Sequence, residues 1–283
     1  MTTRYKVGFQ YFEIDAPEGV IRDDYSIFAT EEKGGENVFR LRVDYQPVGL
    51  DGFIDEVTQE EDGQMIRSGH IGGRSVFRFG LNGVHTGALD CASDYREAHL
   101  GIADDKYHTY TVDNAIMVLY ALATAKKSTL LMHASTVVNG GRAYLFLAPS
   151  GTGKSTHSQL WIKNIPGTKL LNDDNPVVVL KDNQVIVCGS PWSGKLPCYI
   201  NESYPVGAFV VIHRAKYDKA TRLSGIEGYG ALLTSASGKR WERELADALH
   251  GTMNQIIGKV PVYRMDCLPD DNAAKVCHGE VAR

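Results

Sequence analysis

The chain has 283 residues, of which 43% are hydrophobic and 23% are charged, and its formal net charge is −4. A chain of this length can bury a full core, as one large domain or as two unequal ones. The mild acidity argues against a nucleic-acid-binding protein, because phosphate recognition needs clustered Lys and Arg. No apolar run is long enough to span a bilayer, and the first residues lack the apolar stretch of a signal peptide. We therefore expect a cytoplasmic protein without membrane contacts.

The cysteines and histidines carry no recognisable metal or disulfide pattern. The cysteines are odd in number, widely spaced and without a Cys-x-x-Cys pair, which predicts neither a disulfide framework nor a zinc site. The histidines show no metal-ligand spacing such as His-Glu-x-x-His. The sequence thus directs attention to other motifs.

Residues 1–110 are predicted to form a β-rich domain of unknown role. Short strand-like runs at 6–14, 38–45 and 75–79 are separated by turns rich in Gly, Asp and Asn. Residues 112–125 then place apolar side chains at helical spacing and are followed by two lysines, which suit the negative end of a helix. We place the domain boundary before this helix, so that it becomes the first element of a second domain, 111–283.

The next stretch predicts a β-hairpin. Residues 130–138 and 142–147 are apolar runs on either side of Asn139-Gly140-Gly141, which is a strong turn signal. Pairing outward from this turn sets His133 opposite residue 146 or 147, beside the segment that follows the second strand. Because the two strands are antiparallel, the sheet of this domain is expected to be mixed. His133 is a candidate site residue, although a lone histidine in a strand is as often structural.

Residues 148–156 read Ala-Pro-Ser-Gly-Thr-Gly-Lys-Ser-Thr directly after an apolar strand, a pattern typical of a phosphate-binding loop. The glycines let consecutive backbone N–H groups surround a polyphosphate, the lysine adds a cation, and the serine hydroxyl after it can ligate Mg²⁺. The helix that follows points its positive end at the same anion. Ala148 stands where the usual pattern begins with Gly. The residues expected to hold a nucleotide are Ser150, Gly151, Thr152, Gly153, Lys154, Ser155 and Thr156.

Two adjacent carboxylates follow the next predicted strand. A helix at 154–164 leads to a strand at 168–171 and then to Asp173-Asp174, which makes a βαβ unit with a right-handed crossover. The carboxyl ends of both strands then lie at one edge of the sheet, so both aspartates are expected near Ser155. One carboxylate would hold Mg²⁺ and the other would accept a proton from an attacking hydroxyl. A solvated strand end is the alternative reading of such a pair.

The remainder of the chain predicts further strands at 176–180, 184–188, 208–212 and 261–265, and a last long helix at 240–258. The loop at 189–195, Gly-Ser-Pro-Trp-Ser-Gly-Lys, holds an aromatic and a cation, which favours a ligand contact and a packed structural turn equally. It lacks the strand, glycine turn and helix that would frame a second phosphate loop.

Three of these motifs together resemble those of HPr kinase/phosphorylase, which shares its catalytic core with phosphoenolpyruvate carboxykinase. They are His133-Ala134-Ser135, the segment 150–156 and Asp173-Asp174, and the similar region covers about residues 128–265. The resemblance implies an α/β, P-loop kinase fold with a mixed sheet, preceded by the smaller β-rich domain. It also implies Mg-ATP binding and transfer of the γ-phosphate to a hydroxyl. The roles implied are phosphate contact for Lys154, metal contact for Ser155 and Asp174, catalytic base for Asp173, and a site residue beside the loop for His133.

The chain departs from these enzymes in ways that bear on its substrate. Thr156 replaces the Glu of the HPr enzymes, and their acidic downstream segment and glycine-rich C-terminal signature are missing. We therefore expect the acceptor to be the serine of another peptide or protein, or a hydroxyl-bearing small molecule. The alternatives are a nucleotide-binding sensor or regulatory protein and a phosphoenolpyruvate carboxykinase-like enzyme. The N-terminal domain is the candidate for acceptor choice or for contacts in a homo-oligomer.

Overall fold

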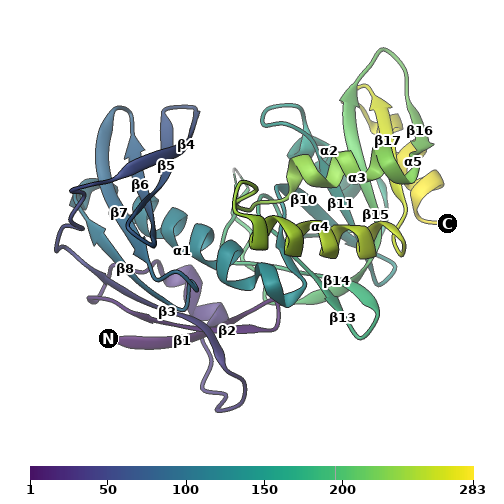
Figure 1. The fold of residues 1–283 in the computed structure, drawn as a ribbon. Helices are drawn as coiled ribbons and strands as arrows, with labels where there is room; N and C mark the ends of the chain where they lie inside the picture. The colour runs from purple at the N-terminus through teal and green to yellow at the C-terminus, as the bar shows by residue number, and fades with distance from the viewer. Residues whose placement is uncertain (195) are drawn as a thin grey trace. The chain divides into compact units, whose positions relative to one another are not determined.

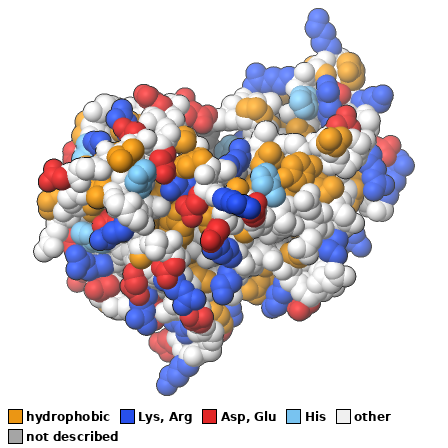
Figure 2. All heavy atoms as spheres, viewed as in Figure 1, with side chains coloured by type: hydrophobic (Ala, Val, Ile, Leu, Met, Phe, Trp, Pro, Cys, Tyr) orange, Lys and Arg blue, Asp and Glu red, His pale blue; other side chains and the backbone are white. Residues whose placement is uncertain are grey.

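A computed structural model of the chain describes residues 1–194 and 196–283 and divides into two units, Met1–Thr124 and Ala125–Arg283 (Figure 1). No helix within these described ranges is both long enough and apolar enough to cross a membrane. Acidic and basic side chains are interspersed over the visible surface (Figure 2), as the small net charge leads one to expect. The fold combines helices with two β-sheets, one in each unit.

The first unit is a β-sheet with one long helix packed on it. Its strands lie in the order β1-β2-β3-β8-β7-β6-β5-β4, and α1 packs against β3, β6, β7 and β8. The expected strand at 6–14 is in fact two strands, because Gly8 and Phe9 take positive φ values of 54° and 71° and turn the chain between them. The bounds are β1 Thr2–Val7, β2 Gln10–Asp15, β3 Asn37–Asp44, β4 Ile54–Glu61, β5 Gln64–Ile71, β6 Arg74–Leu81, β7 Val84–Cys91, β8 Glu97–Ile102 and α1 His108–Thr124.

Helix α1 is part of the first unit. The ring of Tyr120 lies 5.9 Å from that of Phe12, and its hydroxyl donates to the carbonyl of Val7 at 2.8 Å. Leu119 and Ile116 of the same helix are fully buried. The division of the chain therefore falls after the helix, at Thr124, whereas the sequence analysis placed it before the helix.

The second unit is built on a mixed sheet in the order β12-β10-β11-β15-β14-β13-β9, with β17 paired to β15 and β16 to β17. Strands β11, β15 and β17 are parallel, and the other pairs are antiparallel, which confirms the expected mixed sheet. The bounds are β9 Thr129–Leu131, β10 Ala134–Asn139, β11 Arg142–Leu147, α2 Lys154–Asn164, β12 Lys169–Asn172, β13 Val177–Lys181, β14 Gln184–Cys188, β15 Ser203–Arg214, β16 Lys219–Arg222, α3 Gly225–Ser235, α4 Arg243–Ile257, β17 Val262–Cys267 and α5 Asp271–Val281.

Alternating side chains of β11 bury two apolar layers, one on each face of this sheet. Leu145 and Leu147 belong to the cluster that includes Leu249 and Met253 of α4. Between them, Phe146 points to the opposite cluster, which includes Trp161 of α2 and residues of α5. Helices thus cover both faces, and the edge where β11 and β12 end remains for the loops.

The expected strand at 130–138 is also two strands, β9 and β10, which pair with different partners. Strand β9 pairs with β13, and β10 pairs with β11 and β12. At the break, the N–H of His133 donates to the carbonyl of Ser235 at 2.7 Å, outside the sheet ladder. The hairpin closes with Asn139 opposite Arg142, so Ala134, and not His133, lies opposite Leu147. The expected register was therefore wrong by at least one residue.

Candidate functional site

The glycine-rich loop joins β11 to α2 and takes a conformation that needs its glycines. Gly151 and Gly153 have φ values of 70° and 129°, which side chains other than hydrogen rarely allow. Ala148 is not among the residues with positive φ, so an alanine is tolerated there. The loop ends where α2 begins, at Lys154, and the first N–H groups of this helix have no partners within the helix.

The carbonyl groups of the loop are held by donors from two elements, α2 and β15. The ammonium of Lys154 donates to the carbonyl of Ala148 at 3.0 Å. Arg214, the last residue of β15, donates from Nε to the carbonyl of Thr152 at 3.0 Å and from its terminal nitrogen to that of Gly151. Because C=O and N–H point in opposite directions across a planar peptide, the N–H of Gly153 faces away from Arg214. The backbone N–H donors of the loop therefore lie on the side opposite its carbonyl groups.

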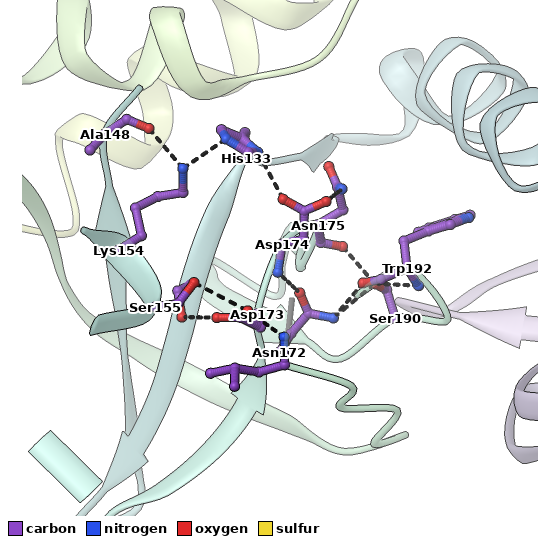
Figure 3. Close-up of polar contacts among 12 residues, drawn as sticks. His133, Ala148, Lys154, Ser155, Asn172, Asp173, Asp174, Asn175, Ser190 and Trp192 are labelled. Carbon is purple, nitrogen blue, oxygen red and sulfur yellow. Dashed lines mark hydrogen bonds and ion pairs between the residues drawn. The ribbon is translucent and has the colours of Figure 1, made fainter. Parts of the chain in front are cut away.

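Lys154, His133 and Asp174 form a chain of polar contacts beside this loop (Figure 3). The ammonium of Lys154 lies 2.7 Å from Nε2 of His133, and Nδ1 of His133 lies 3.0 Å from Oδ1 of Asp174. The lysine has only donors, so Nε2 of the imidazole accepts and the proton sits on Nδ1, which donates to the carboxylate. Asp174 also accepts from the side-chain amide of Asn175 at 2.6 Å. The break between β9 and β10 places His133 at the centre of this chain.

Asp173 does not belong to this chain of contacts and is buried, with 3% of its surface exposed. Its Oδ2 accepts from the hydroxyl of Ser155 at 3.2 Å and from the N–H of Leu196 at 3.1 Å. Its Oδ1 accepts from the hydroxyl of Ser135 at 2.9 Å, and Ser135 in turn contacts the hydroxyl of Ser158 at 2.6 Å. The carboxylate is therefore surrounded by donors from β10, α2 and the segment after β14.

A second group of hydrogen bonds anchors the segment that covers Asp173. The side-chain amide of Asn172 donates to the hydroxyl of Ser190 at 3.1 Å and to the carbonyl of Trp192 at 2.9 Å. A Cβ at Gly194 would lie 3.1 Å from the carbonyl oxygen of Asp173, so this segment passes close over the aspartate. Lys195, the cation noted in the sequence, lies outside the described residues. The Gly-Ser-Pro-Trp-Ser-Gly run is therefore in contact with the site.

The structure brings most of the sequence-derived candidates together. Lys154, Ser155, His133 and both aspartates meet at the ends of β11 and β12, which lie parallel with β10 between them. Ser155 contacts Asp173, whereas Asp174 contacts His133. No role was predicted for Ser158, Ser135 or Arg214. Their partners lie on other elements of the fold, so only the tertiary structure reveals them.

Comparisons with known proteins match part of the chain. The model of a family described as SynChlorMet cassette protein ScmC matches residues 100–267. None of the curated proteins matches the chain. A solved structure of the Hpr(Ser) kinase/phosphatase from Coxiella burnetii is 14% identical in sequence with a TM-score of 0.34, and the match covers 54% of this chain and 88% of that one. A likeness this weak carries no argument about the reaction.

Proposed function

The chain belongs to the ScmC family of SynChlorMet cassette proteins, and we propose that this member is an ATP- and Mg²⁺-dependent phosphotransferase. Its acceptor is the hydroxyl of a small molecule or of a serine in a peptide or protein. The observation that carries the proposal is the convergence of Lys154 and Ser155 with Asp173 and Asp174 at one edge of the sheet. A cation, a metal-ligating hydroxyl and two carboxylates are the parts that phosphoryl transfer needs.

The loop fits a polyphosphate. Its carbonyls are turned toward Arg214 and Lys154, and the N-terminus of α2 adds unpartnered N–H groups and the positive end of the helix dipole. Lys154 exchanges its contact with Ala148 and His133 for the β- and γ-phosphates when a nucleotide binds. This exchange frees Nε2 of His133 beside the transferred group.

The residues also fit Mg²⁺, which takes oxygen ligands and is held by one or two protein groups together with phosphate oxygens. Among residues 1–194 and 196–283 no group of three or more His, Cys, Asp and Glu side chains could hold a metal ion, so the nucleotide would complete the coordination. The ion would neutralise charge on the phosphates. The contact of Ser155 with Asp173 favours these two as its protein ligands.

The contacts thereby favour a division of labour that is the reverse of the one implied by the resemblance. Asp174, rather than Asp173, is then the carboxylate left to accept the proton of the hydroxyl. Its side chain is 31% exposed and oriented by His133, whereas Asp173 is buried under the segment that follows β14. Asp173→Asn is expected to weaken the metal dependence of nucleotide binding, and Asp174→Asn to leave binding intact and abolish transfer. The opposite pattern would restore the division implied by the resemblance.

The test of the proposed function is isothermal titration with a non-hydrolysable ATP analogue, with and without Mg²⁺. We expect metal-dependent binding that Lys154→Ala weakens at least tenfold. Lys163→Ala is the matched control, because this lysine lies on the same helix but is paired to Asp271 at the surface. Transfer is then sought with γ-labelled ATP and a panel of hydroxyl-bearing acceptors. Absence of binding to the wild-type chain would overturn the proposal.

A nucleotide-dependent sensor is the second candidate, and the burial of Asp173 favours it. All three donors to this carboxylate come from the protein, and one is the backbone of the covering segment at Leu196. If this segment stayed over Asp173 when a nucleotide binds, the protein would bind the nucleotide without transferring phosphate. Stoichiometric labelling of any acceptor would rule the sensor out.

A further inference from the structure

Two arginines face each other directly in the sheet of the first unit. Arg67 of β5 lies opposite Arg78 of β6 in the antiparallel register of these two strands. Like charges at directly opposed positions of a sheet repel each other and destabilise the pair. Such a pair is expected where an anion compensates both charges.

Three other arginines of the same sheet have close acidic partners, and this pair does not. Arg40, Arg42 and Arg74 lie within 3.1 Å of a carboxylate oxygen of Glu13, Asp44 and Asp90, respectively. By contrast, the nearest carboxylate oxygen of Asp55 lies 3.9 Å from Arg67, in a pair whose side chains are 41% and 53% exposed. One weak, solvated contact leaves most of the charge of the two arginines uncompensated.

The inner nitrogens of both guanidinium groups are buried and unsatisfied. Nε of Arg67 and Nε of Arg78 are each inaccessible to solvent and have no hydrogen-bond partner among the described residues. A buried donor without a partner is uncommon and calls for an explanation. The nearby imidazole of His85 supplies no negative charge, and its pKa is lowered by desolvation and by the charge of Arg78.

The surroundings of the pair are small or apolar. Ala88 of β7, which is 2% exposed, lies opposite Arg78, and the ring centroid of Phe53 lies 5.6 Å from Cζ of Arg78. The same ring covers Gly69 of β5, where a Cβ would come within 2.6 Å of it. A ligand bound at Arg67 and Arg78 would therefore contact two guanidinium groups next to the apolar ring of Phe53.

We propose that Arg67 and Arg78 form a binding site for an oxyanion, a carboxylate or phosphate group carried by a small molecule. The guanidinium group presents a planar fork of donors that matches two oxygens of such a group. This site lies in the first unit and does not depend on the proposed reaction of the second. It gives the first unit a role in binding a small molecule that carries such a group.

The test is ¹⁵N NMR of the arginine Nε–H groups in the full chain, titrated with sodium phosphate and with sodium succinate. Sodium chloride at matched ionic strength is the reference, and Arg67→Gln and Arg78→Gln assign the two resonances. We expect both to shift saturably with at least one of the two probes while those of Arg40 and Arg42 stay in place. A response to phosphate alone or to succinate alone identifies which oxyanion the site prefers. Shifts that sodium chloride reproduces, or no saturable shift with either probe, would overturn the proposal.

Variants separate this site from the glycine-rich loop. Arg67→Gln is expected to weaken the response at Arg78 at least tenfold, and Arg42→Gln, on β3 of the same sheet, is the matched control. Lys154→Ala should leave the response unchanged, because the loop belongs to the other unit. A response that Lys154→Ala abolishes and Arg67→Gln does not would assign the anion to the loop, which would leave the proposed function standing and overturn this site.

Discussion

Asp173 shows how a single side chain depends on distant parts of the sequence. Its donors are Ser135, Ser155 and the backbone of Leu196, which lie on β10, on α2 and in the segment between β14 and β15. A hydrogen bond to an ionised group contributes about 1.5–3 kcal/mol, more than one between neutral groups. The buried carboxylate is therefore both a candidate for chemistry and a determinant of stability.

Ser135→Ala is expected to lower the free energy of unfolding by about 1.5–3 kcal/mol, because Asp173 Oδ1 then stays buried without this donor. Ser158→Ala is the matched control, since it removes only the neutral partner of the same hydroxyl and should cost about 0.5–1.5 kcal/mol. Urea unfolding followed by circular dichroism measures both. Equal losses of unfolding free energy in the two variants would show that the charge of Asp173 does not strengthen its hydrogen bond from Ser135.

His157 makes stability depend on pH. It is 2% exposed, and burial lowers its pKa to about 4, while in the unfolded chain a histidine has a pKa of about 6.5. Between these values the unfolded chain binds a proton that the folded chain does not, so stability falls as the pH drops from about 6.5 to about 4. The full loss is on the order of 3 kcal/mol.

The measurement is the free energy of unfolding against pH for the wild type and for His157→Gln. Carboxylates titrate in the same range in both chains, so the difference between the two curves isolates the histidine. We expect the difference to change across this range, with the flatter curve in the variant. Parallel curves would contradict a neutral, buried His157.

The sequence identified the residues of the candidate site better than it identified their partners. Lys154, Ser155 and the two aspartates follow from local patterns of strand, glycine turn and helix, and the structure confirms that they lie together. Their roles in nucleotide binding remain predictions. Ser158 and Arg214 could not be assigned, because what each contacts depends on which strands pair and in what register.

At the scale of elements, the conformation of the glycine-rich loop depends on β15, a strand that comes much later in the sequence. Arg214 at the end of β15 holds the carbonyls of Gly151 and Thr152. Because the side chain is exposed, it can act on the loop without being essential to the core. The loop is thus supported from β15 as well as from its own helix.

Arg214→Ala is expected to weaken binding of the Mg²⁺ complex of an ATP analogue about tenfold, a change of about 1.4 kcal/mol, because the loop loses the donors that fix its carbonyls. The melting temperature should change little. Arg222→Ala, at an exposed position on β16, is the control, and titration calorimetry is the measurement. An affinity equal to that of the wild type would show that the loop holds its shape without Arg214.

The elements themselves were predicted unevenly. Helix α2 has the expected bounds, since its glycine start and periodicity are local signals. The break at His133 was not predicted, because an unbroken apolar run does not reveal a change of strand partner. Helix α3 was also missed, since its several glycines disfavour a helix. One of them, Gly228, has a packing reason, as a Cβ there would lie 3.1 Å from the side chain of Val262 on β17.

At the scale of the whole molecule, the sequence indicated two parts but not where to divide them. The periodicity of α1 is that of any amphipathic helix and does not tell which sheet it covers. Its contacts with Phe12 and Val7 assign it to the first unit. The boundary between the two units therefore depends on tertiary packing, which the local sequence pattern does not reveal.

A fragment of residues 1–124 is expected to unfold cooperatively, and a fragment of residues 1–110 is not. Removing most of α1 uncovers apolar side chains of the sheet, such as Phe12 and Leu100, which are fully buried in the structure. Thermal melting followed by circular dichroism compares the two, with dye binding to report exposed apolar surface. A cooperative transition in the shorter fragment would show that the helix is dispensable to the first unit.

The position of β15 late in the chain has a consequence for synthesis. Strand β11 pairs with β15 on one side, and the ribosome makes residues 203–214 well after β11, the loop and α2 have emerged. Until then one edge of β11 has no partner, and Leu145 lacks the side chains of α4 that belong to its apolar layer. Open, apolar strand edges are sites of intermolecular pairing. Nascent chains that stall before residue 203 should therefore require chaperones, although they already carry Lys154, Ser155 and both aspartates.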